Sequence, residues 1–90
     1  MVTIRNFIWD DNNIDHVAQH NVKPEEVEEV FASSYYLKHL WGNRYIAYGR
    51  NQSGRYLFVA FDYEKQSVAI ATARNMTDGE KRLYKRKVIK

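Results

Sequence analysis

The feature that most constrains the fold is a long stretch of strand-like sequence between residues 35 and 74. Four segments within it concentrate or alternate apolar and aromatic side chains in the manner of β-strands, and they read YYLKHLW, RYIAYGR, RYLFVAFDY and VAIATAR. The last three are separated only by the short turn-like connectors NQSG and EKQS, and HLWGNR joins the first to the second. Because strands joined so closely pair with their chain neighbours, the sequence predicts that the last three strands form an antiparallel meander.

Helical signals precede this stretch. A short strand-like run over residues 3–9 is followed by DDNN, which offers N-cap residues for a helix over about residues 13–20. Asn21 suits the left-handed conformation that ends a helix, and Pro24 suits the first turn of a second helix. The sequence therefore predicts one strand and two helices before the meander.

A last helix follows the meander. Thr77 and Glu80 have the spacing of a capping box, in which the threonine caps the third helical amide and the glutamate reaches back, so we expect a helix from there to about residue 87. The predicted order is β-α-α-β-β-β-β-α. This is an α+β fold with one mostly antiparallel sheet packed by helices, in a single small domain over residues 1–90.

The composition narrows the classes of protein that the chain can represent. Its 90 residues contain no cysteine, which excludes a disulfide framework and a thiolate metal site. No run approaches the ~20 apolar residues that span a bilayer, and the first residues lack the apolar core of a signal peptide. We therefore expect a cytoplasmic protein that does not interact with membranes.

Charge is distributed unevenly along the chain. Residues 1–34 hold seven acidic side chains against two basic ones, a net charge of −5, whereas residues 74–90 hold seven basic against two acidic, a net charge of +5. A basic end of this kind favours a polyanionic partner such as nucleic acid. The alternative is a solvated basic helix face, which is common on proteins that bind no nucleic acid.

The strongest positional argument concerns Arg74. It ends the last predicted strand directly before a helix, where a guanidinium and open helix amides together suit a phosphate. Thr72 lies two residues earlier on the same side of that strand. Arg50 and Arg55 flank the NQSG turn and Arg44 begins the preceding strand, but their convergence on Arg74 depends on strand register. The alternative is that Arg74 makes a salt bridge at a sheet edge.

Histidines and tyrosines give weaker signals. His16 and His20 lie four residues apart on one predicted helix face, but two ligands make a weak metal site, so we expect no metal. His39 lies in a strand, where it is either an acid–base group in a groove or a surface residue. Several of the seven tyrosines stand beside basic residues, as in KRLYKRK, a pattern that suits unstacked RNA bases but is also common on sheet faces.

Taken in order, these features resemble the BrnT family of toxins, which have a RelE-like ribonuclease fold. The resemblance covers nearly the whole chain. It rests on Trp9-Asp10, on QHNVKPEEVEEVF, on Gly54-Arg55 at the start of a strand, and on the closing series of Thr-Ala-Arg, Thr77, Glu80 and Tyr84. No single motif is diagnostic, and the order of the motifs identifies the family.

The resemblance implies the toxin of a type II toxin–antitoxin system, which cleaves RNA and inhibits translation. Its partners would be RNA and a cognate antitoxin, usually a DNA-binding repressor, in a homodimer or a heterotetramer with the antitoxin. The resemblance matches Arg74 to the arginine of the family's Ser-Ala-Arg-Lys segment. It matches His20 to the histidine of Lys-His-Gly and Arg55 to the arginine of Gly-Arg. The chain departs from that pattern where Thr72 replaces serine, Asn75 and Gln19 replace lysine, and Asn21 replaces glycine.

The chemistry expected of such a toxin is ribonuclease cleavage without metal or cofactor. The 2′-hydroxyl attacks the adjacent phosphorus while a base removes its proton, an acid protonates the leaving 5′ oxygen, and a cation stabilises the phosphoryl oxygens. Arg74 is expected to be that cation. His20, His39 and Tyr84 are the candidates for proton transfer, with no order among them.

The remaining cations are expected to bind RNA. The predicted RNA-binding residues are Arg55, Arg50, Thr72, Lys81, Arg82 and Lys85. An alternative reading is a catalytically degenerate module of the same fold that binds RNA or antitoxin and cuts nothing. A third is an interaction domain whose basic helix contacts an acidic protein.

Overall fold

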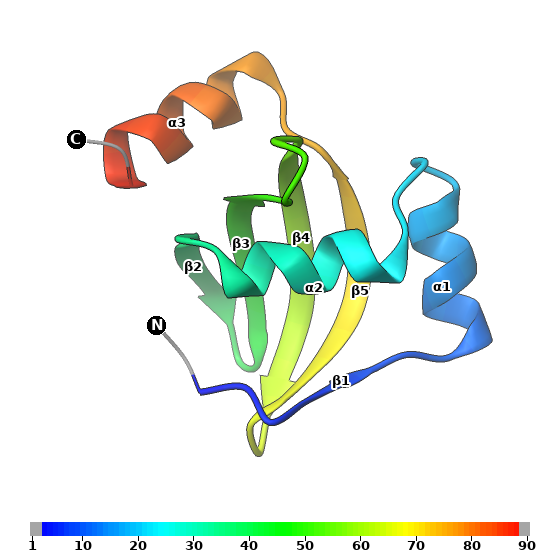
Figure 1. The fold of residues 1–90 in the computed structure, drawn as a ribbon. Helices are drawn as coiled ribbons and strands as arrows, with labels where there is room; N and C mark the ends of the chain where they lie inside the picture. The colour runs from blue at the N-terminus through cyan, green and yellow to red at the C-terminus, as the bar shows by residue number, and fades with distance from the viewer. Residues whose placement is uncertain (1–2, 89–90) are drawn as a thin grey trace.

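The computed structural model describes residues 3–88, and its elements follow the predicted order. They are β1 (Asn6–Ile8), α1 (Asp11–Ala18), α2 (Pro24–Ala32), β2 (Tyr36–Trp41), β3 (Arg44–Arg50), β4 (Tyr56–Glu64), β5 (Ser67–Asn75) and α3 (Asp78–Val88). The predicted α+β architecture is thus confirmed (Figure 1). Within residues 3–88, none of the helices is long and apolar enough to cross a membrane.

One five-stranded sheet with the order β1-β5-β4-β3-β2 forms the centre of the fold. Strands β2 to β5 pair antiparallel with their chain neighbours, which confirms the predicted meander. β1 lies at the far edge, parallel to β5, and spans only three residues, fewer than predicted for residues 3–9. Residues 3–5 lie before β1 and belong to no strand, and after β1 the chain turns into α1 past Trp9, whose indole donates to Glu28 at 2.8 Å.

The helix ends follow from local side-chain bonds. α1 begins two residues earlier than predicted because Asp10 caps it, accepting from the amide of Asn13 while the Asn13 side chain accepts from the amide of Asp10. Asn21 has a φ of +58° and ends this segment, as expected. The capping box of α3 is also present, since Thr77 and Glu80 each accept from the other's backbone amide.

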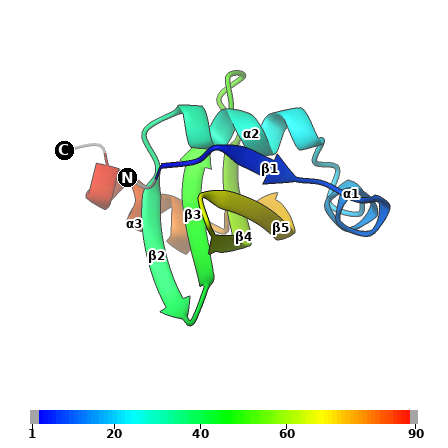
Figure 2. The same cartoon turned by 90° about the horizontal axis from the view of Figure 1, so that it is seen from below.

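The two faces of the sheet have separate apolar cores. α1 and α2 cover one face, where the largest fully buried side chains, including Phe61 and Leu57, pack with the buried valines of both helices. Figure 2 shows α2 lying along this face. α3 lies over one end of the opposite face and packs on β2 and β3 around the buried Tyr84. We call this opposite face the α3 face.

A β-bulge at Ala71 determines which face Arg74 occupies. Val68 and Ile70 face the α1–α2 core, and strict alternation along β5 would place Arg74 on that same side. Ala60 pairs with Thr72, but the next residue of β4, Phe61, pairs with Ile70. Ala71 is therefore an extra residue in β5. The alternation is therefore reversed, and Thr72 and Arg74 lie on the α3 face.

Candidate active site

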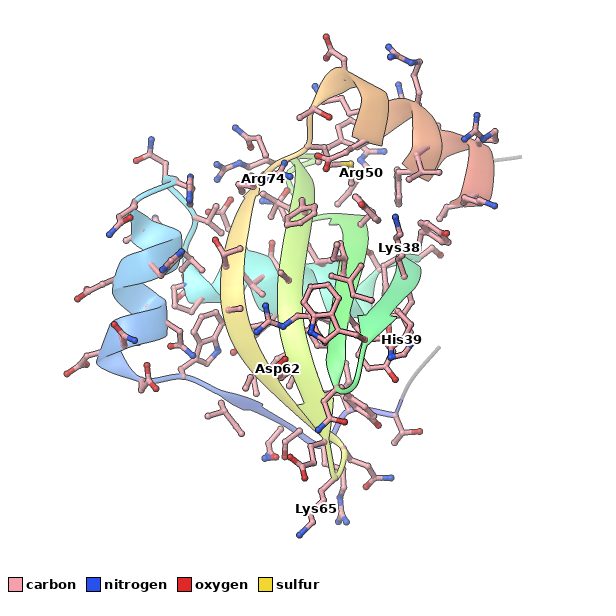
Figure 3. All side chains as sticks on the ribbon, turned by 180° about the vertical axis from the view of Figure 1, so that it is seen from behind. Lys38, His39, Arg50, Asp62, Lys65 and Arg74 are labelled. Carbon is pink, nitrogen blue, oxygen red and sulfur yellow. The ribbon has the colours of Figure 1, made fainter. Side chains whose placement is uncertain are left out.

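The α3 face brings cationic and aromatic side chains together at the end of the sheet nearest α3. Register places them in rows across the strands, since Arg50 pairs with Tyr56, Tyr48 with Phe58, and Phe58 with Arg74. Figure 3 shows Arg50 and Arg74 at this end of the sheet, and Lys38 on β2 at the side. The sequence alone did not indicate this convergence because it depends on strand register and on the bulge.

Arg74 is held by contacts with Glu80, Asn75 and Phe58. Its Nη1 and Nη2 donate to the two carboxylate oxygens of Glu80 at 2.8 and 3.0 Å, and Nη1 also donates to the carbonyl of Asn75 at 3.0 Å. Its guanidinium carbon lies 3.9 Å from the ring centroid of Phe58. A cation over an aromatic face and a bidentate carboxylate together fix the orientation of the guanidinium.

One edge of that guanidinium remains open. Glu80 occupies the edge formed by Nη1 and Nη2, whereas Nε and the second hydrogen of Nη2 donate to no atom of residues 3–88. These two hydrogens form the second fork of an arginine, which matches two oxygens of a phosphate. The side chain is 34% exposed, so this edge is accessible to a ligand.

The electrostatics favour charged forms of the pair and a neutral tyrosine beside it. Hydrogen bonding from Arg74 lowers the pKa of Glu80, despite an opposing effect of burial. Hydrogen bonding to Glu80 raises the pKa of Arg74. Burial raises the pKa of Tyr48, with a smaller contribution from the charge of Glu80. At neutral pH the site therefore contains an ion pair and a neutral phenol.

Three further cations surround the ring of Tyr56. The guanidinium carbon of Arg50 lies 4.9 Å from its centroid, and the ammonium nitrogens of Lys81 and Lys85 lie at 5.7 and 5.4 Å. Three of the predicted RNA-binding residues are thus brought together. Arg82 is exposed on α3, and its side chain has no hydrogen bond or ion pair within the described part of the chain.

Arg55, also predicted to bind RNA, is engaged inside the protein. Its Nε donates to Oδ1 of Asn75 at 2.7 Å, its Nη1 to the carbonyl of Asn21 at 2.7 Å and to the carboxylate of Glu26 at 3.2 Å, and its Nη2 to the carbonyl of His20 at 3.2 Å. These bonds join α1, α2 and β5. They assign Arg55 a structural role, while its predicted contact with RNA stays a prediction.

The three candidate proton carriers do not meet at Arg74. His39 pairs with Tyr45, whose side chain packs on the α1–α2 core, so His39 projects from the face that α1 and α2 cover and not from the α3 face. Its ring forms a hydrogen bond with the carbonyl of Gly42 at 2.9 Å. The His20 ring is exposed beyond α1. Tyr84 is 3% exposed, and its hydroxyl donates to the carbonyl of Ser34 at 3.1 Å. Their catalytic roles stay predictions without geometric support.

Burial also keeps Tyr84 protonated, because burial raises the pKa of its phenol. His16 and His20 have their rings 6.4 Å apart on the surface of α1 and the turn after it. Within residues 3–88, no group of three or more histidine, cysteine, aspartate or glutamate side chains is placed to hold a metal ion.

Sequence reasoning missed the aromatic side chains that pack around Arg74. Phe58 and Tyr48 were not singled out, and Glu80 was assigned only to helix capping. The available signal was the alternation within RYLFVAFDY, which puts Tyr56 and Phe58 on one face, together with the position of Glu80 at the third residue of a helix. Neither signal identifies the partner strand, so the contact with Arg74 could not be inferred.

Comparison with known proteins adds an identity to this geometry. A family model described as the ribonuclease toxin BrnT of type II toxin–antitoxin systems matches residues 9–80, which include Arg74 and Glu80. The fold is similar to that of the Brucella abortus ribonuclease toxin BrnT, with a TM-score of 0.65 and 17% sequence identity over 81% of this chain and 97% of that chain. No curated protein sequence matches the chain. With four fifths of its length matched by the family model, the chain belongs to the BrnT family of ribonuclease toxins of type II toxin–antitoxin systems.

Proposed function

We propose that this toxin cleaves RNA on the α3 face, with the open edge of Arg74 bound to the scissile phosphate. The observation that supports this most strongly is the guanidinium fork of Nε and Nη2, which is accessible while the other edge is fixed by Glu80. A cation held in place before substrate binds stabilises developing negative charge without reorganisation at the moment of reaction.

The proposed reaction needs no metal or cofactor. The 2′-oxygen forms a bond to phosphorus and loses its proton, the bond from phosphorus to the 5′ oxygen breaks, and that oxygen gains a proton. The products are a 2′,3′-cyclic phosphate and a 5′-hydroxyl. Arg74 binds the two non-bridging oxygens, whose charge increases in the transition state.

We assign the proton of the 2′-hydroxyl to Glu80, because Glu80 is the carboxylate bonded to Arg74. Its lowered pKa makes it a weak base, because general bases work best with a pKa near the working pH. We therefore assign most of the rate enhancement to charge stabilisation and to positioning of the RNA. This assignment of the 2′-hydroxyl proton to Glu80 differs from the expectation that a histidine or Tyr84 transfers it.

The flanking RNA backbone is proposed to follow the basic side of α3. Lys81, Arg82 and Lys85 lie along that helix, and Lys38 extends the cationic surface onto β2 (Figure 3). Thr72 pairs with Ala60 on the same face, two residues from Arg74, where its hydroxyl is suited to a ribose or phosphate oxygen. Binding through several phosphates should weaken steeply with salt.

Membership in the family implies an antitoxin protein as a partner. We propose that the antitoxin, as a DNA-binding repressor, forms a heterotetramer with two copies of the toxin. We also propose that the toxin acts in the cytoplasm, where its RNA substrate is found, and that cleavage there stops translation.

Protein synthesis in bacterial cells tests the proposed function. Pulse labelling with an amino acid follows induction of the wild type, Arg74→Ala or the control Arg5→Ala at matched levels of folded protein. We expect labelling to fall rapidly with the wild type and Arg5→Ala but not with Arg74→Ala. Inhibition by a folded Arg74→Ala protein would overturn the role of Arg74, and a wild type without effect would overturn the toxin activity itself.

A degenerate binding module is the second candidate, and two observations favour it. Arg74 is already neutralised by Glu80, and none of the predicted proton carriers contacts it. Such a module would retain RNA at low salt and leave it uncut. RNA retention on filters, measured together with mapping of RNA ends, separates this candidate from the ribonuclease.

A further inference from the structure

We propose that the cations around Tyr56 form a second phosphate subsite, which binds the phosphate next to the scissile one. We call this group, made of Arg50, Tyr56, Lys81 and Lys85, the Tyr56 cluster. The inference rests on the proposed function, because it assigns the substrate at least one phosphate beyond the one that is cut. It gives the cluster a defined ligand in place of general attraction for RNA.

The charges of the Tyr56 cluster are not balanced. Arg50, Lys81 and Lys85 all lie within 5.7 Å of the centre of one ring, and none of them forms an ion pair with any residue in the range 3–88. By contrast, Arg44, Arg55 and Arg74 each have a carboxylate partner. Like charges gathered at close range repel each other, and a bound anion relieves that repulsion.

Arg50 adds an independent observation. Its Nε is buried and has no hydrogen-bond partner among residues 3–88, which is rare for a polar atom in a folded protein. Its terminal nitrogens donate to no described residue and retain access to solvent. Gly54 keeps room for this side chain, since a Cβ at Gly54 would lie only 2.9 Å from Nη2 of Arg50. The guanidinium is therefore positioned without a protein acceptor.

The distance between the two sites suits consecutive phosphates. Tyr56 and Phe58 are two residues apart on the α3 face of β4, so their side chains are separated by ~7 Å along the strand. Arg50 lies over the first ring and Arg74 over the second. Neighbouring phosphates of an extended RNA strand have a comparable separation, so one strand can reach both guanidinium groups.

The surroundings of Tyr56 favour a phosphate over a base. Three cations approach the ring, and Tyr84 packs edge-on against it with centroids 5.9 Å apart, so little of the ring is free for stacking. Beside it lies an open depression of about 390 Å³, lined by Gly54, Arg55, Tyr56, Asn75, Met76 and Lys81. This space accommodates a phosphate group next to Lys81, whereas Arg50 and Lys85 lie outside its lining.

Binding of short, uncleavable RNA analogues tests the subsite. Three 2′-O-methyl dinucleotides are compared by NMR titration at low salt: one without a terminal phosphate, one with a 5′-phosphate and one with a 3′-phosphate. For the wild type we expect one of the two phosphates to tighten binding by about tenfold or more. The preference should disappear in Lys85→Gln and Arg50→Gln and persist in the control Arg5→Gln. Lys85→Gln keeps the test valid if Arg50→Gln does not fold, because Lys85 is an exposed helix residue.

Equal affinity for all three dinucleotides in the wild type would overturn the subsite, as would an unchanged preference in a folded Lys85→Gln protein. Binding that weakens when a base is removed but does not depend on the terminal phosphate would also overturn it in favour of stacking. Because these ligands cannot be cut, the result does not depend on catalysis. A wild type that binds them as expected but cleaves no RNA would contradict the proposed function and leave the subsite supported.

Discussion

Arg55 and Arg74 make the same kind of contact in two different settings. Each pairs with a glutamate that also caps a helix, since Glu26 accepts from the amide of Lys23 before α2 and Glu80 accepts from the amide of Thr77 before α3. All three guanidinium nitrogens of Arg55 donate within the protein, whereas Nε and the second hydrogen of Nη2 of Arg74 have no acceptor among residues 3–88.

This difference distinguishes the structural role of Arg55 from the proposed ligand-binding role of Arg74. The bonds of Arg55 fix the ends of α1 and α2 to β5, and Asn75 contributes an acceptor that the lysine expected there could not provide. Arg74 is oriented just as firmly, but part of its hydrogen-bonding capacity faces the open α3 face. A saturated arginine stabilises a fold, and an oriented arginine with a free edge binds a ligand.

The largest expected effect is on cleavage. Replacing Arg74 with alanine should slow single-turnover cleavage of RNA by about 10²–10³-fold, as for the loss of a donor that stabilises a developing charge. Arg74→Lys should also be impaired, because an ammonium cannot bind Glu80 and a phosphate through two forks. Urea unfolding checks that both variants are folded. A folded Arg74→Lys protein with wild-type rates would show that charge alone suffices.

The next effect is on stability. Arg55→Ala should lower the free energy of unfolding by about 2–3 kcal/mol, because it removes the charged partner of Glu26, which keeps only the neutral donors of Asn51 and Lys23, and the donor to two backbone carbonyls. Adding Glu26→Gln should recover part of this loss, since the unpaired charge is then removed. Cleavage per folded molecule should stay within about twofold in both variants. A much slower folded Arg55→Ala protein would place Arg55 in the active site.

A smaller effect concerns pH. The pKa of Glu80 is lowered in the folded protein, so its contribution to stability is present above its ordinary value of 4.5 and is lost as the pH falls through the lower folded value. Glu80→Gln should cost about 1 kcal/mol at pH 7 and reduce the loss of stability as the pH falls below 4.5. Urea unfolding of both proteins across this range measures the effect. Parallel curves would argue against the ion pair.

The smallest effect is expected for a residue outside both the Arg74 site and the Tyr56 cluster. His39→Asn should change the cleavage rate by less than about twofold and stability by less than about 0.5 kcal/mol, because His39 is exposed on the face opposite Arg74. The same kinetic and unfolding measurements apply. A tenfold loss of cleavage would show that the RNA extends over the edge strand β2 to the other face.

Much of the fold could be predicted because its signals are local. Alternation within the strands, the turns between them, Asn21 and the capping box of Thr77 each depend on a few consecutive residues. The parallel pairing of β1 with β5 and the bulge at Ala71 could not be predicted, since both depend on packing between distant segments.

The candidate site was only half visible in the sequence for the same reason. Arg74 was identified by its place between a strand and a helix, and Lys81 and Lys85 by the charge of the last helix. Phe58 reaches Arg74 only through the register of β4 and β5. Arg50 and Arg55 are equivalent in sequence beside one turn, yet they lie in different surroundings, and only tertiary structure distinguishes them.

The most direct test follows the Nε–Hε signals of the arginines by ¹H–¹⁵N NMR while an uncleavable 2′-O-methyl RNA is added. The account predicts that the Arg74 signal moves, because its Nε gains a phosphate acceptor, and that the Arg55 signal stays in place, because its Nε already donates to Asn75 at 2.7 Å. Signals are assigned with Arg74→Lys and Arg55→Lys. An unchanged Arg74 signal at saturating RNA, or a shift at Arg55 in its place, would contradict the account.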